Sequence, residues 1–161
     1  MYTTLEIASI VGAPNVNLVG REIDWLLTDS RSLCYPESTL FFAIKTKTGD
    51  GHRYIGDLYK RGARAFVVSE KPAGDFPDAD FIIVPDTLHA LQLLAAYHRS
   101  RFNIPVIGIT GTNGKTTTKE LIRAVLAECY NVMATEGNFN NDVGVPKTLF
   151  RLNDSHDIAV V

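Results

Sequence analysis

The feature that most constrains the fold is a strand, a glycine-bearing turn and a helix in direct succession. Residues 106–109 form an apolar run of strand length, and the turn Thr110-Gly-Thr-Asn-Gly-Lys-Thr116 follows it. Glycines allow backbone N–H groups to surround an anion, and the start of a helix adds partial positive charge. We therefore expect a phosphate-binding loop in which Lys115 reaches the outer phosphates and the Thr116 hydroxyl holds Mg²⁺.

The match to the general phosphate-loop pattern G-x-x-x-x-G-K-[ST] is imperfect. The pattern places its first glycine at position 109, where this chain has Ile109 between Gly108 and Gly111. The alternative is a glycine-rich turn that binds nothing. The strand before the turn and the helix after it favour the phosphate loop.

Composition describes an ordinary globular protein. The 161 residues are 45% hydrophobic and 21% charged, with a net charge of −2 that gives no electrostatic reason to expect nucleic acid. No apolar run approaches the roughly 20 residues that span a bilayer, and the start of the chain lacks the pattern of a signal peptide. Cys34, Cys129 and the histidines show neither disulfide nor metal spacing. We expect a cytoplasmic protein without membrane insertion.

Strand patterns alternate with helix patterns, which predicts an α/β fold. We expect helices over 3–12, with Thr3 and Glu6 as a capping box, and over 88–101, with Thr87 as the cap. A strand is expected over 23–28. We place a boundary near residue 100, between a small N-terminal α/β substrate-binding domain, 1–100, and the first strands and helices of a phosphate-loop parallel-sheet domain, 101–161.

Further strands and helices are expected along both domains. The strands are 40–44, 65–69, 81–84, 106–109, 131–134 and 157–161, and the helices are 54–61, 116–129 and 145–151. A complete phosphate-loop domain normally has five or more parallel strands. Because only three follow the boundary, we expect a piece of a longer protein.

Two further polar clusters stand out. The first is Asp29-Ser-Arg31, followed by Lys45 and by Asp50-Gly-His52, all after expected strands. It could form a shallow pocket for a polar ligand, although a surface salt bridge between Asp29 and Arg31 is the default. The second is the Asn-rich loop, Glu136–Pro146. Taken alone, it predicts only a turn before a helix.

Together, these motifs resemble the Mur ligase family, which builds the peptide of cell-wall precursors. The resemblance rests on Thr110–Thr116, on Asp-Ser-Arg before the Leu40-Phe-Phe-Ala strand, on Asp-Gly-His, and on Gly62-Ala63. It implies ATP-binding residues Gly111, Thr112, Asn113, Gly114, Lys115, Thr116 and Thr117. Of these, Lys115 and Thr116 would be catalytic, and Thr116 would bind Mg²⁺. The implied contacts to the UDP-sugar are Ser30, Arg31, Ala43, Lys45, Asn138, Asn140 and Asn141.

The implied activity is an ATP-dependent amide ligation through an acyl phosphate. The Asn-rich loop resembles that of the family member that adds D-Ala-D-Ala to UDP-N-acetylmuramoyl-tripeptide. Alternatives are the member that completes the tripeptide, a non-catalytic UDP-sugar-binding module, the ligase half of a fusion with alanine racemase, and an unrelated phosphate-loop kinase or GTPase. We expect a monomer. We also expect these residues alone to be inactive, because the family's acidic metal ligand, modified lysine and dipeptide-binding domain do not occur among them.

Overall fold

The structure, a computed structural model, describes residues 2–46, 49–137, 139 and 141–161. These divide into two compact units, Met1–Leu94 and Ala95–Val161, and helix α3 (Thr87–Ser100) contributes to both. The division falls a few residues before the boundary expected near residue 100. Both units contain parallel sheets, so the expected α/β fold class is confirmed.

The first unit is built on a parallel sheet with the strand order β3-β4-β5-β6. Its elements are β1 Tyr2–Thr3, α1 Thr4–Ile10, β2 Glu22–Ile23, β3 Trp25–Leu27, β4 Thr39–Phe42, α2 Ile55–Lys60, β5 Ala65–Val68 and β6 Asp80–Ile83, with 3-10 helices at Ser30–Ser32, Pro36–Ser38 and Gly51–Tyr54. The central strands β4 and β5 are buried along their whole length. Strands covered on both faces are continuous apolar runs, and this is what the sequence shows there.

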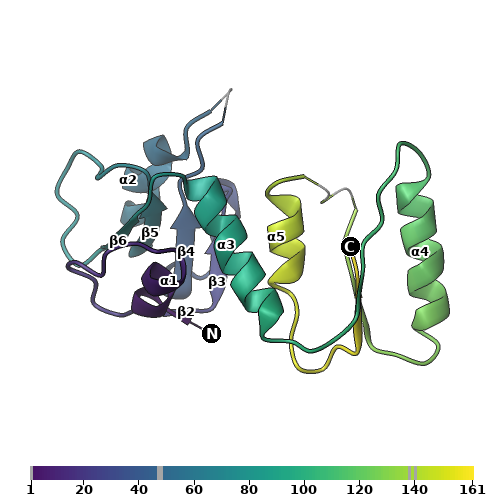
Figure 1. Ribbon diagram of the computed structural model, residues 1–161. Helices are drawn as coiled ribbons and strands as arrows, with labels where there is room; N and C mark the ends of the chain where they lie inside the picture. The colour runs from purple at the N-terminus through teal and green to yellow at the C-terminus, as the bar shows by residue number, and fades with distance from the viewer. Residues whose placement is uncertain (1, 47–48, 138, 140) are drawn as a thin grey trace. The chain divides into compact units, whose positions relative to one another are not determined.

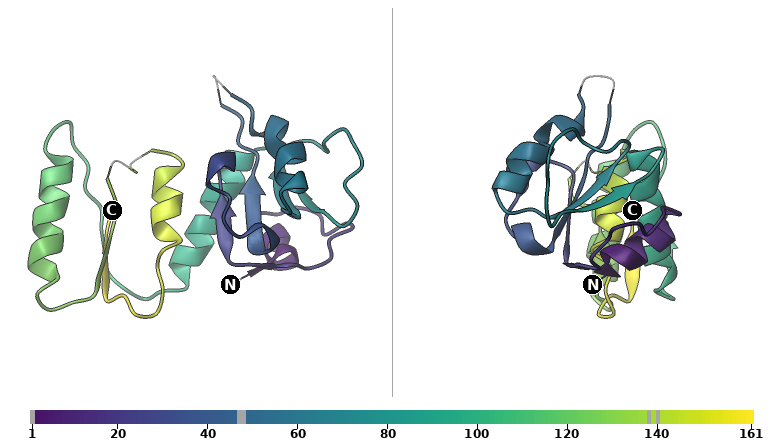
Figure 2. Two further views of the ribbon diagram at one scale, coloured as in Figure 1. Left: turned by 180° about the vertical axis from the view of Figure 1, so that it is seen from behind. Right: turned by 90° about the vertical axis from the view of Figure 1, so that its left-hand side faces the viewer.

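Helices cover both faces of this sheet. Helix α2 packs Ile55 and Leu58 against Phe41 and Phe66 on one face. Helix α1 and the first part of α3 lie on the other face (Figures 1 and 2). The sheet is therefore held in a three-layer arrangement, and its strand ends are left for the loops.

The prediction of one continuous strand over 23–28 is wrong. The chain forms β2, which pairs antiparallel with β1, and then β3, which pairs parallel with β4. Between them, the Asp24 N–H donates to the Ser38 carbonyl at 3.0 Å. The two halves separate because they hydrogen-bond to different partners, which residue type alone does not reveal.

One of the two expected helix caps is correct. Thr3 and Glu6 form the capping box at α1, so that prediction is confirmed. At α3 the cap is Asp86, whose Oδ1 accepts the N–H groups of residues 88 and 89 at 2.9 and 3.1 Å. Thr87 is buried instead, and its hydroxyl donates to the Ala43 carbonyl at 3.1 Å. The expected cap at Thr87 was wrong because that hydroxyl is used in a tertiary contact.

The second unit is a smaller parallel sheet with helices on both sides. Its elements are β7 Val106–Ile107, α4 Lys115–Leu126, β8 Val132–Ala134, α5 Gly144–Leu149 and β9 Ile158–Val160. The strand order is β7-β9-β8, and α4 and α5 lie on opposite faces (Figure 1). Met133, Leu152 and Ala159 form its core. The last strand in sequence is therefore the central one, which places the ends of β7 and β8 on either side of it.

Candidate functional site

The expected phosphate loop connects β7 to α4. Gly111 and Gly114 have φ angles of +148° and +76°, a range that side chains other than glycine rarely adopt. Gly114 directly precedes α4 and supplies no side-chain cap. The first N–H groups of a helix have no partner within the helix. The start of α4 therefore offers backbone donors to an anion.

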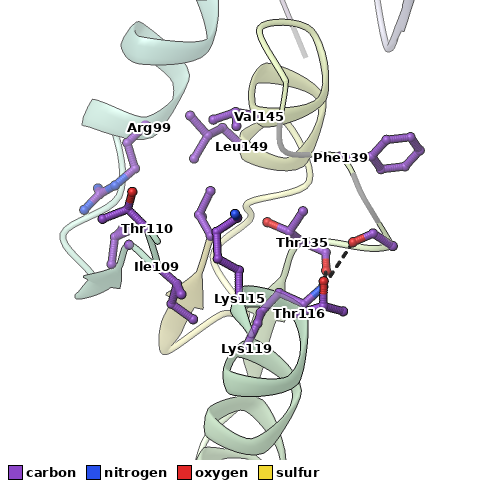
Figure 3. A pocket seen from close by; sticks show the side chains of 14 residues that line it. Arg99, Ile109, Thr110, Lys115, Thr116, Lys119, Thr135, Phe139, Val145 and Leu149 are labelled. Atoms are coloured by element: carbon purple, nitrogen blue, oxygen red, sulfur yellow. Dashed lines mark hydrogen bonds between the residues drawn. The ribbon is translucent and has the colours of Figure 1, made fainter. Parts of the chain in front are cut away.

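A cavity of about 600 Å³ opens beside this helix start (Figure 3). Lys115 and Thr116 both line it. The Lys115 ammonium donates to the Gly111 carbonyl at 2.5 Å, which lays the side chain across the loop. Of the expected ATP contacts, Lys115 and Thr116 thus face the cavity. The others, Gly111, Thr112, Asn113, Gly114 and Thr117, are exposed in the loop and the first turn of α4, and their role stays a prediction.

The remaining walls come from several elements of the second unit. They are Arg99, Val106, Gly108, Ile109, Thr110, Lys119, Thr135, Gly137, Phe139, Val145, Leu149 and Val161. Thr110, Thr135 and Val161 follow the carboxyl ends of β7, β8 and β9. Open parallel sheets bind their ligands at this edge. The cavity therefore lies where the topology places a ligand site, with an apolar side beside its polar side.

Two polar groups in the wall have unusual hydrogen bonding. Thr135 is 6% exposed, and its hydroxyl has no hydrogen-bond partner among the described residues. Lys119 is equally buried, and its ammonium donates to the Thr135 carbonyl. A buried hydroxyl without a partner costs free energy unless a ligand or water bonds to it. Thr135 therefore offers a hydrogen bond to whatever fills the cavity.

The residues fit a nucleotide with Mg²⁺. Backbone donors, Lys115 and the Thr135 hydroxyl can meet phosphate oxygens, and the apolar wall can cover the less polar part of a ligand. Mg²⁺ in nucleotide sites commonly takes only one or two protein ligands beside phosphate and water, so the single hydroxyl of Thr116 suits it. In the described residues, no cluster of three or more His, Cys, Asp or Glu side chains could hold a metal by itself.

The expected UDP-sugar contacts of the first unit lie at the carboxyl edge of its sheet. Ser30 and Arg31 follow β3, and Ala43 and Lys45 follow the neighbouring β4. Ala43 is fully buried, and its N–H and carbonyl bond to Val67 and Thr87. Its side chain has no surface for a ligand, whereas Arg31 and Lys45 are exposed.

Asp29 holds the Arg31 guanidinium in the expected salt bridge. Its two carboxylate oxygens accept from Nε and Nη2 at 2.9 and 2.7 Å. These hydrogen bonds, and the negative charge, raise the pKa of Arg31. The Arg31 side chain nevertheless stays 87% exposed. The expected surface salt bridge between Asp29 and Arg31 is thus present, and the Arg31 guanidinium remains accessible to a ligand.

The His52 side chain stabilises the loop that carries Lys45 through hydrogen bonds. Its Nδ1 donates to Asp50 Oδ1 at 2.6 Å, and its Nε2 accepts the Ser69 N–H at 2.9 Å. The His52 backbone N–H, and then its ring, lower the pKa of Asp50. Asp50 also lies 3.8 Å from the Lys45 ammonium. The Asp-Gly-His sequence therefore connects the ends of β4 and β5.

Asp50, His52 and Ser69 have the residue types of a hydrolase triad. The Ser69 hydroxyl lies 3.2 Å from His52 Nε2. In a triad, that nitrogen takes the serine proton. Here, its lone pair already accepts the Ser69 backbone N–H, so the imidazole cannot act as the base. The cluster is structural.

The Asn-rich loop begins at the cavity. Asn138 and Asn140, two of the expected UDP-sugar contacts, lie outside the described residues. Asn141 Oδ1 accepts the N–H groups of Val143 and Gly144 at 3.2 and 2.7 Å, which fixes the start of α5. Its oxygen thus performs the structural role of a turn before a helix, and its contact with a ligand stays a prediction.

Three polar wall residues outside the two loops were not anticipated as site residues: Arg99, Lys119 and Thr135. Arg99 lines the cavity, and its guanidinium donates to the carbonyls of Phe102 and Ile104. Lys119 stands four residues after Lys115, a spacing that places both on one helix face. That spacing could have identified Lys119 from the sequence. Nothing local marks Arg99 or Thr135.

Comparison with known proteins gives one family for both units. Residues 22–99 match the model of the Mur ligase family, catalytic domain, and residues 109–161 match the Mur ligase middle domain. A UDP-N-acetylmuramoyl-tripeptide–D-alanyl-D-alanine ligase of Synechocystis sp. is 46% identical over 86% of this chain, which covers 30% of that protein.

Solved structures agree with the sequence matches. MurF from Acinetobacter baumannii has a TM-score of 0.91 at 31% identity, over 99% of this chain and 35% of that one. MurF ligase from Thermotoga maritima in complex with ADP has a TM-score of 0.72 at 29% identity, over 87% of this chain and 31% of that one. The chain therefore spans about a third of the length of these proteins.

Proposed function

The chain belongs to the Mur ligase family, and on that premise we propose that it binds ATP and UDP-N-acetylmuramoyl-tripeptide within a ligase that adds D-Ala-D-Ala. The observation that carries the proposal is the cavity at the start of α4, lined by Lys115 and Thr116. We assign the UDP end of the substrate to residues 1–100 and ATP to residues 101–161. The names of the similar ligases, which give UDP-N-acetylmuramoyl-tripeptide and D-alanyl-D-alanine, support the substrates of this proposal.

Bound ATP would supply the γ-phosphoryl group that converts the substrate carboxylate to an acyl phosphate, with ADP as the leaving group. The amine of D-Ala-D-Ala would then attack the acyl carbon and release inorganic phosphate, which leaves the amide bond. Lys115 and the N–H groups of 112–117 would stabilise charge on the transferring group. Thr116 would hold Mg²⁺. The complex of the similar Thermotoga maritima ligase with ADP supports an adenine nucleotide as the ligand.

The sugar nucleotide would use the exposed cations of the first unit. Arg31 and Lys45 follow adjacent parallel strands, and both charges can pair with a diphosphate. Ser30 lies beside Arg31 in the same turn and adds a hydroxyl. We assign Asn138, Asn140 and Asn141 to the sugar, because amides both donate and accept hydrogen bonds.

Calorimetry with Lys115→Ala tests the nucleotide site. A charge-assisted contact is worth about 1.5–3 kcal/mol, so the affinity for Mg·ATP should fall about tenfold to a hundredfold. Lys60→Ala, at the exposed end of α2, is the control and should leave the affinity unchanged. Equal affinities of the Lys115→Ala variant and the unaltered chain would refute the assignment.

Titration with UDP-N-acetylmuramoyl-tripeptide tests the substrate. Binding that weakens on Arg31→Ala supports the ligase, because that side chain is exposed and charged. If the chain binds ATP but not the sugar nucleotide, a phosphate-loop kinase or GTPase explains it better. Binding of the sugar nucleotide without ATP would indicate a non-catalytic binding module.

We expect no ligation from residues 1–161 alone, since the similar ligases are about three times longer. ADP release that depends on D-Ala-D-Ala would contradict this expectation. In a longer enzyme that contains these residues, Lys115→Ala should lower turnover by about 10²–10³. A monomer in the cytoplasm, where ATP is available, is the state that fits this function. In the described residues no helix is long and apolar enough to cross a membrane.

A further inference from the structure

Lys119 is a buried cation beside the phosphate loop. It lies one turn after Lys115 on α4 and lines the same cavity (Figure 3). Its side chain is 7% exposed. A charge removed from water is costly unless its hydrogen bonds are satisfied. The contacts of its ammonium therefore show what the residue does.

The ammonium has three acceptors in reach. They are the Thr135 carbonyl, the Gly137 carbonyl at 3.4 Å and Glu120 Oε1 at 3.2 Å. A lysine has three N–H donors, so each has an acceptor within the protein. No donor is left for a phosphate. Lys119 thus holds two backbone carbonyls beyond its own helix, whereas the Lys115 ammonium donates to the Gly111 carbonyl within the loop before that helix.

The backbone it holds is the entry to the Asn-rich loop. Thr135 follows β8, and Gly137 has a φ of +51°. The loop is then fixed at its far end, where Asn141 accepts the Gly144 N–H. The contacts of Lys119 also keep the Thr135 hydroxyl at the cavity wall, where it has no partner among the described residues.

We propose that Lys119 is a positioning residue that ties the start of the Asn-rich loop to the helix of the phosphate loop. One side chain then sets the geometry of both loops. The consequence for ligands rests on the proposed function: a loosened Asn-rich loop should bind the sugar nucleotide more weakly, while Lys115 and Thr116 still meet ATP.

Hydrogen exchange on the 161-residue chain tests the positioning role without a ligand. Lys119→Met keeps the apolar stem but removes the donors, so the amides of 135–137, 139 and 141–145 should exchange at least about tenfold faster. Arg123→Met, which also removes an ion pair with Glu120, is the control and should leave these amides unchanged. Lys119→Arg should restore most of the protection. If Lys119→Met does not fold, Lys119→Gln, which is too short to reach both carbonyls, replaces it.

Unchanged exchange in Lys119→Met or Lys119→Gln would overturn the proposal. Calorimetry tests the consequence for ligand binding. The affinity of Lys119→Met for UDP-N-acetylmuramoyl-tripeptide should fall about tenfold relative to the unaltered chain, with a smaller change for Mg·ATP. Faster exchange with undiminished sugar-nucleotide affinity would also overturn the role in binding. If the unaltered chain binds neither ligand, the proposed function fails, and the exchange result still decides whether Lys119 positions the loop.

Discussion

Hydrogen-bond partners separate residues that hold the fold from residues that can meet a ligand. Both ring nitrogens of His52 bond within the protein, and so does the Lys119 ammonium. The Thr135 hydroxyl has no partner among the described residues, although it is buried. Residue type alone would favour His52 and Lys119 over Thr135 as ligand contacts, because histidine and lysine are the commoner catalytic groups. The hydrogen bonds indicate the reverse.

His98 gives a prediction for pH. Burial lowers its pKa below the ordinary value of 6.5, and its Nε2 donates to the Leu152 carbonyl at 3.0 Å. The folded state then binds fewer protons than the unfolded state between the folded pKa and 6.5. The contribution of His98 to stability is therefore complete above 6.5 and is lost as pH falls from there toward the folded pKa.

Thermal unfolding of the second unit between pH 7.5 and 5 measures this effect. The midpoint should fall on acidification, and His98→Gln, which can still donate to Leu152, should flatten the slope. The same slope in both proteins would assign the pH dependence to other groups.

At the level of elements, two glycines near the same helix have opposite roles. Gly51 begins the 3-10 helix before α2, and a Cβ there would lie 2.8 Å from the Ile44 nitrogen and 2.9 Å from the Ala43 Cα. Gly56 lies within α2, and a Cβ there meets nothing within 4 Å. The first glycine allows close approach of two backbone segments, whereas the second only weakens a helix.

We expect Gly51→Ala to destabilise the first unit by about 1–3 kcal/mol, because backbone atoms cannot move aside cheaply. Gly56→Ala should stabilise it by about 0.5–1 kcal/mol through helix propensity. Denaturant midpoints of the two variants measure both changes. Equal and small shifts would show that the Asp-Gly-His turn can accommodate a side chain.

At the scale of the whole molecule, each unit has its own core. Phe66 belongs to the core of the first unit and Met133 to that of the second. Proteins of more than one unit often depart from two-state unfolding. We therefore expect two denaturant transitions. Met133→Ala should lower the free energy of one by about 2–5 kcal/mol, and Phe66→Ala should lower the other by about 3–5 kcal/mol.

Fluorescence and circular dichroism of both variants check this expectation. A single transition that both variants shift alike would mean that the units unfold together.

Contiguous patterns were the most predictable from sequence. The glycine-bearing turn between β7 and α4, the capping box of Thr3 and Glu6, and the salt bridge of Asp29 and Arg31 each involve residues within a few positions. Strands β4 and β5 were recognised because burial on both faces makes an unbroken apolar run. The split between β2 and β3 and the cap at Asp86 were missed, since each depends on a partner distant in sequence or on competition for one hydroxyl.

The sequence by itself determined the fold class, the family and the place of the glycine-bearing turn before α4, because local propensity and motif spacing suffice for these. Only the tertiary structure showed that Lys119 reaches across to the Thr135 carbonyl, 16 residues away, and that Ser69 meets His52. The physical reason is that parallel strands bring together loops that are separated in sequence by whole helices. Which donors and acceptors then meet depends on packing.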